Sequence, residues 1–118
     1  MEKEVKIMAI VKYSGHGIGQ NGNINLTLKA EYGELVNMMQ LAQMLNNDVS
    51  VKVKMPEENP FKLGFFRIKS LNIAGDGETT LKLNSLSDFV EVGNLNRLIA
   101  SERFAAKFES LVEIEDED

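Results

Sequence analysis

Residues 24–47 read INLTLKAEYGELVNMMQLAQMLNN, and the spacing of their apolar side chains changes partway along. Ile24, Leu26 and Leu28 alternate with polar residues, which predicts a strand with one polar face. From residue 31 to residue 47 the apolar positions follow helical spacing instead. The stripe that faces the core is predicted to consist of Tyr32, Leu35, Val36, Met39 and Ala42, and to be widened by Met38, Leu41 and Leu45. This stretch therefore predicts a mixed fold with one main helix.

Outward from this stretch, alternating apolar and polar residues predict further strands at residues 5–13, 49–55, 63–73 and 79–83. Gly64 and a change of parity around it predict a β-bulge in the strand at 63–73. Residues 14–22 contain four glycines, which predicts a long mobile hairpin loop. Asn94 is typical of the N-cap of a short helix. Residues 104–114 fit a strand or a helix, and the β-branched Val112 and Ile114 favour a strand.

These elements predict an α+β fold with no internal repeat. We expect a mainly antiparallel sheet of five to six strands, with the main helix packed on one face and a second, short helix. Residues 1–114 are predicted to form a single domain, which a chain of 118 residues can fill with one core. Residues 115–118 are predicted to form an acidic, disordered tail.

Composition excludes several kinds of chemistry. The chain has no cysteine, which rules out disulfides and thiolate catalysis, and one histidine, His16, is too few for an ordinary zinc site. We therefore expect neither a metal nor a cofactor. The charged start of the chain and the lack of a long apolar stretch predict a cytoplasmic protein that does not associate with a membrane.

The net charge of −5 comes from the end of the chain. Five of the last six residues are acidic, and without them the 13 remaining acids equal the 13 lysines and arginines. The rest of the chain is therefore formally neutral. This distribution argues against a domain that imitates nucleic acid through its overall charge.

No residue pattern predicts catalysis. His16 and Ser14 lie in a glycine-rich loop that cannot hold them in a fixed geometry. The same loop leads into a strand rather than into a helix, unlike the loops that bind nucleotide phosphates. An enzyme or a ligand-binding module is accordingly the third of three functional hypotheses.

Cations on the strands support a second hypothesis, the binding of single-stranded nucleic acid. Eight lysines and arginines occupy polar strand positions, and Phe65 lies in phase with Arg67 and Lys69. Basic side chains around an aromatic ring are typical of sheets that bind single strands. The alternative is that strand lysines only keep the sheet soluble. The candidate contact residues are Lys52, Lys54, Phe65, Arg67, Lys69 and Lys82.

The first hypothesis is a non-catalytic protein that binds another protein. The glycine-rich loop and the acidic tail are the segments best suited to contact, because loops on a rigid sheet often carry binding residues. The candidate contact residues are His16, Ile18, Gln20, Asn21, Glu115 and Asp116.

The short length, the absence of cysteine, the lysine-rich strands and the acidic segment at 113–118 also resemble, in style, a group of known proteins. These are the small, functionally unassigned proteins of phages and prophages of low-GC bacteria. The resemblance implies an accessory role in the host cytoplasm, either as a modulator or inhibitor of a host enzyme or in phage DNA metabolism. It assigns no role to any single residue.

Overall fold

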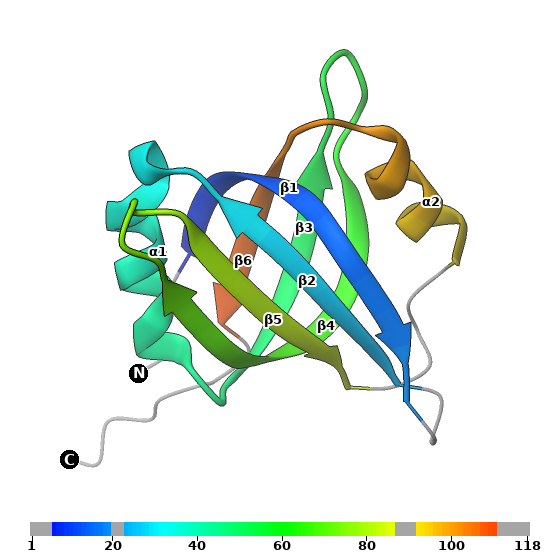
Figure 1. Ribbon diagram of the computed structural model, residues 1–118. Helices are drawn as coiled ribbons and strands as arrows, with labels where there is room; N and C mark the ends of the chain where they lie inside the picture. Colours follow the sequence, from blue (N-terminus) through cyan, green and yellow to red (C-terminus); the bar gives the residue numbers. More distant parts are fainter. Residues whose placement is uncertain (1–5, 20–22, 87–91, 111–118) are drawn as a thin grey trace, which may run out of the picture.

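The computed structural model describes residues 6–19, 23–86 and 92–110, and Figure 1 shows their arrangement. Its strands form a closed, antiparallel barrel in the order β1-β2-β5-β4-β3-β6. In chain order the elements are β1 (Lys6–Ile18), β2 (Ile24–Ala30), a 3-10 turn (Tyr32–Glu34), α1 (Leu35–Leu41), a second 3-10 turn (Ala42–Met44), β3 (Asp48–Lys54), β4 (Phe61–Ile73), β5 (Thr79–Ser85), α2 (Val92–Ala100) and β6 (Phe104–Ser110). The predicted tail, residues 115–118, lies outside the described residues.

The prediction of an α+β fold, in which a main helix packs on one face of the sheet, was wrong. The core lies inside the barrel, where each strand contributes an alternating set of buried side chains, among them Phe66, Phe108, Leu26, Leu28, Ile68 and Leu81. The inner faces of the strands cover one another, so no helix is needed over the sheet. Instead α1 and α2 lie on opposite sides of the barrel (Figure 1).

The barrel closes because two long strands change partners along their length. Residues 6–11 of β1 pair with β6, whereas residues 12–18 pair with β2. In β4, residues 61–67 pair with β3 and residues 66–73 pair with β5. Each of these two long strands has a bulge in its second half, between Tyr13 and Gly15 in β1 and between Ile68 and Ser70 in β4. Bulges increase strand twist, which closure requires.

The predicted core face of the main helix was partly wrong. Met38 and Leu41, which were predicted to widen the stripe, are buried, whereas three residues of its centre are exposed. The helix is interrupted by 3-10 turns, and its buried side chains are Met38, Leu41 and Met44. Tyr32, Val36 and Met39 are 68%, 70% and 57% exposed, although the ring of Tyr32 lies against Gly77. Because the barrel supplies its own core, only one narrow face of this short helix is needed to cover it.

The predictions for the individual strands, the loop and the bulge were confirmed in part. The hairpin of the first two strands is confirmed, but residues 14–18 of the predicted loop belong to β1. The bulge near Gly64 is confirmed by the register shift between Val51 and Lys52 opposite it. The preference for a strand over residues 104–114 is confirmed as far as Ser110. Within the described residues, no helix has the length and apolar character needed to cross a lipid bilayer.

The two halves of the barrel have the same topology. Strands of 13, 7 and 7 residues, with a helix before the third, occur as β1-β2-α1-β3 and again as β4-β5-α2-β6. Adding 55 to a residue number of β1 or β2 gives its counterpart, from Lys6 to Phe61 and from Ile24 to Thr79. Exchanging the halves leaves the strand order unchanged.

The bulges of β1 and β4 are separated by the same offset of 55 residues. The unpaired bulge residues are Ser14 in β1 and Lys69 in β4, which are 55 residues apart. The expectation of no internal repeat was therefore wrong at the level of structure. The repeat escapes the sequence because the two halves share alternating burial rather than identical residues, with the pairs Leu26/Leu81 and Leu28/Leu83 among the few identities.

Two substitutions on α1 test which of its faces is buried. Met38→Ala should lower the free energy of unfolding by about 2–4 kcal/mol, because the side chain is fully buried. Val36→Ala should change it by less than about 0.5 kcal/mol, because Val36 is exposed. Urea unfolding followed by circular dichroism measures both. The opposite ranking would mean that Val36, and not Met38, faces the core.

Candidate functional site

The outer surface of β4 carries a line of basic side chains around one aromatic ring. Lys62, Arg67 and Lys69 are exposed, and Phe65 is partly buried on the same face. The bulge opposite Val51 brings Lys62 and Phe65 onto one side of the strand although they are three residues apart. We call these four residues, with Lys52 of β3 and Lys82 of β5 beside them, the β4 ridge.

One end of the β4 ridge is a row of lysines across three strands. Lys52 pairs directly with Lys62 of β4 on one side and with Lys107 of β6 on the other. On β1, the next position of this row is the exposed Met8, which pairs with Lys107. Like charges at directly opposed positions destabilise a sheet. The row is therefore costly for the protein alone and favourable for an anion that bridges the lysines.

The carboxylate of Glu109 partly neutralises the positive charge of this lysine row. Its Oε1 atom lies 3.4 Å from Nζ of Lys52 and 3.7 Å from Nζ of Lys107, and its side chain is only 15% exposed. Burial alone would raise the pKa of this carboxyl group. The positive charges of Lys52, Lys107 and Lys6 outweigh that effect and hold the pKa below its ordinary value. The lysine row thus already stabilises one negative charge.

The aromatic ring of the β4 ridge is in contact with a cation. Nζ of Lys62 lies 3.7 Å from the centre of the Phe65 ring, a cation–π arrangement. This contact holds the lysine over the ring and beside the lysine row.

The other end of the β4 ridge holds cations with little compensation. Arg67 Nε donates a hydrogen bond to Asp48 Oδ1 at 2.9 Å, which neutralises it. Lys69 is the bulge residue of β4, and Lys82 pairs with Ser70. Within residues 6–19, 23–86 and 92–110, neither Lys69 nor Lys82 has a carboxylate partner.

The structure places five of the six predicted nucleic-acid contacts on the β4 ridge, namely Lys52, Phe65, Arg67, Lys69 and Lys82. The sixth, Lys54, lies at the end of β3 and donates a hydrogen bond to the carbonyl of Met55. The eight strand cations do not share one face, since a barrel distributes them around its circumference. Lys12 and Lys29 lie away from the ridge and pair with Glu78 at 4.0 and 3.8 Å.

Sequence reasoning missed two members of the lysine row. Lys62 precedes the residue at which the strand was predicted to begin. Lys107 was not counted among the strand cations, although a strand was favoured for residues 104–114 and its alternation places Lys107 on the polar face.

The predicted protein contacts are only partly described. Ile18 is 72% exposed at the end of β1. His16 is exposed, and its Nδ1 atom lies 2.5 Å from the hydroxyl of Tyr13. Gln20, Asn21, Glu115 and Asp116 lie outside the described residues.

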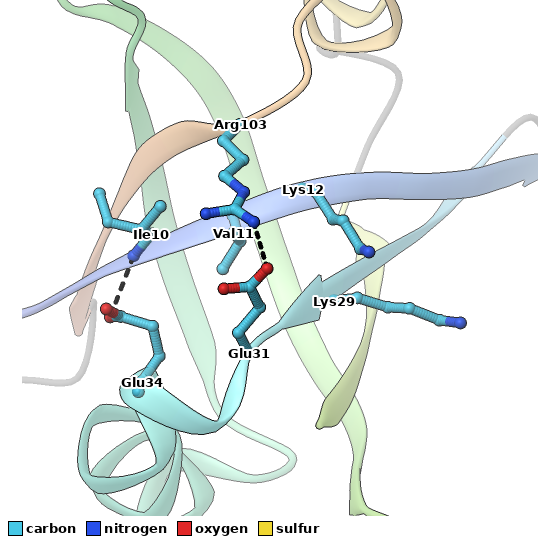
Figure 2. Close-up of a pocket in the computed structure, with 8 residues that line it drawn as sticks. Ile10, Val11, Lys12, Lys29, Glu31, Glu34 and Arg103 are labelled. Carbon is cyan, nitrogen blue, oxygen red and sulfur yellow. Dashed lines mark hydrogen bonds and ion pairs between the residues drawn. The ribbon is translucent and has the colours of Figure 1, made fainter. Parts of the chain in front are cut away.

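Figure 2 shows a pocket of about 190 Å³ between β1 and the start of α1. Glu31 and Arg103 form an ion pair across it, and Glu34 Oε1 accepts a hydrogen bond of 3.1 Å from the backbone amide of Ile10. The ladder between β1 and β2 begins at the pair Lys12–Lys29, so the amide of Ile10 lies before its start. Glu34 thus replaces a missing strand partner, and we interpret these contacts as structural.

The described residues contain no group of three or more histidine, aspartate and glutamate side chains that could hold a metal ion. No known protein family matches the sequence, and no curated protein matches it either.

Replacing Glu109 by Gln tests whether the lysine row needs a negative charge. Because the folded pKa of Glu109 is lowered, the carboxylate contributes stability above its unfolded pKa of about 4.3, and that contribution is lost as the pH falls through the folded value. At pH 7, Glu109→Gln should be less stable than the unaltered protein by on the order of 1 kcal/mol. The difference should shrink towards pH 3.

Unfolding by urea at several pH values measures this dependence. The control is Glu102→Gln, at an exposed position next to β6, which should have little effect at any pH. An equal loss at both ends of the pH range would show that Glu109 acts through packing rather than through its charge.

Proposed function

We propose that the protein binds single-stranded nucleic acid along the β4 ridge. The observation that carries the proposal is the row of directly opposed lysines, Lys62, Lys52 and Lys107, next to the partly exposed ring of Phe65. A phosphate that bridges two of these ammonium groups removes their mutual repulsion. A base that takes the place of the Lys62 ammonium over the Phe65 ring adds a stacking contact that is available only in a single strand.

The local charge supports this proposal although the chain as a whole is acidic. The β4 ridge and Lys107 together carry six cations, at positions 52, 62, 67, 69, 82 and 107. Two carboxylates, Asp48 and Glu109, pair with members of this set. Four positive charges therefore remain on one strand and its neighbours. Such a stripe binds phosphates at short range, even though a neutral body provides no long-range attraction.

The outer surface of a barrel favours a single strand over a duplex. Double-stranded DNA is read by an element that enters a groove, such as a helix or a two-stranded ribbon. The cations of the β4 ridge instead lie on the strands of the barrel wall. A flexible single strand can follow this wall and turn its bases towards Phe65. This function fits the accessory role in phage DNA metabolism that the resemblance implies, and we place it in the cytoplasm.

The test is a titration of a fluorescently labelled oligothymidylate, followed by anisotropy at several salt concentrations. With about four phosphate contacts, the logarithm of the binding constant should fall with the logarithm of salt concentration with a slope of about −3. Phe65→Ala should weaken binding about tenfold through lost stacking, and Lys52→Gln should reduce the salt slope by about one contact. Glu109→Gln should tighten binding, because it removes the internal competitor for the lysines.

Lys29→Gln is the matched control. It also removes a strand lysine, but one that pairs with Glu78 away from the β4 ridge, so binding should not change. No binding by the folded protein at low salt would refute the proposal. Equal losses in Lys29→Gln and Lys52→Gln, without an effect of Phe65→Ala, would reduce it to unspecific attraction of polyanions.

A second candidate function, the binding of a protein, is favoured by the exposed apolar side chains of Tyr32, Val36 and Met39 on the helical segment. Exposed apolar groups at helical spacing are typical of contact faces. The double substitution Val36→Asp and Met39→Asp should then abolish any self-association seen in sedimentation velocity, and leave oligonucleotide binding intact. Sedimentation as a monomer at all concentrations would exclude a second copy as the partner at this surface.

A further inference from the structure

A groove of about 450 Å³ crosses the outer surface of the barrel beside the end of the β4 ridge that carries Lys69 and Lys82. Its lining includes two glycines of β1, Gly15 and Gly17, and the polar residues Asn25 and Thr27 of β2. Lys69 and Lys82 of the β4 ridge line it as well. The register explains this grouping, because Gly15 pairs with Thr27 and Thr27 pairs with Lys82.

Gly17 has no evident role in the protein alone. A Cβ atom added there would meet no atom within 4 Å, so packing does not require a glycine. Its backbone is not in the left-handed region either. Glycine inside a strand weakens it and often marks a site where a ligand approaches the backbone closely. Gly17 therefore leaves bare backbone at the floor of the groove.

The groove has the chemistry of a phosphodiester site. Two ammonium groups, from Lys69 and Lys82, have no carboxylate partner in the described part of the chain. The hydroxyl of Thr27 and the amide of Asn25 are short polar groups that can donate hydrogen bonds to phosphate oxygens.

We propose that this groove is a second subsite of the same interface, which holds the sugar–phosphate backbone of a strand whose bases contact Phe65. The inference rests on the proposed function and extends it. From Phe65 to Lys69 the distance along β4 is about 13 Å, and from β4 to β1 there are three strand spacings, about 14 Å. A path of about 27 Å corresponds to roughly four nucleotides when extended and eight when stacked. The ligand is therefore a single strand of at least about four nucleotides if it is extended, or about eight if its bases are stacked.

The test compares oligothymidylates of about 4, 8 and 12 nucleotides. Gly17→Val adds a side chain whose Cβ atom meets no atom within 4 Å, and it places a residue suited to strands in the groove. It should weaken binding of the longest oligonucleotide about tenfold, and leave the shortest, which can occupy the Phe65 end alone, unchanged. Lys82→Gln should act in the same direction. Thermal unfolding checks that both variants are folded.

Asn72→Val is the matched control, an exposed position of β4 that does not line the groove, and it should bind all lengths normally. Unaltered binding of the longest oligonucleotide by Gly17→Val and Lys82→Gln would overturn this inference and leave the β4 ridge as the whole site. Absence of binding at every length by the unaltered protein would instead refute the proposed function. Equal weakening of all lengths would also overturn the inference, because it would place the groove and Phe65 in one indivisible site.

Discussion

The change of partners along β1 is the constraint on which the structure depends. Its first half completes β6 and its second half completes β2, so a single strand joins two edges that would otherwise be free. Pairing with β2 alone would leave β6 with an open edge and the interior side chains facing water. At the point of exchange the amide of Ile10 is left without a strand partner, and Glu34 accepts its hydrogen bond. Closure gives the molecule an inner apolar surface and an outer polar one, and the helices are left to cover what remains.

Much of this fold follows from local patterns in the sequence. Strands, hairpins and the bulge near Gly64 are set by neighbouring residues, and the alternation of Leu26 and Leu28 with polar positions identifies the buried side of β2. An open sheet and a closed barrel, however, produce the same alternation along each strand. The difference lies in pairings between distant strands, such as β1 with β6, which no local pattern specifies. The helical stripe was misleading for the same reason, because Val36 and Met39 have helical spacing whether or not a sheet lies beneath them.

The candidate site was partly accessible from the sequence. Parity along β4 identified Phe65 and Arg67 as neighbours on one face, and that relation is local. The lysine row was not accessible, because Lys52, Lys62 and Lys107 meet only through the register of three strands. The sequence also gave no reason to separate Lys29, which Glu78 neutralises, from Lys82, which faces the groove. Charge pairing depends on which strands are adjacent, and closure decides that.

The matching halves of the barrel have a consequence for how the chain folds and for its origin. Neither half can complete a sheet by itself, because β2 pairs with β5 and β3 pairs with both β4 and β6. Two copies of a half-length chain, however, would supply the same set of pairings and close the same barrel as a dimer. The architecture is thus one that gene duplication and fusion would produce from a small homodimer. In the fused chain the second half is covalently linked to the first, so the assembly of the barrel no longer depends on protein concentration.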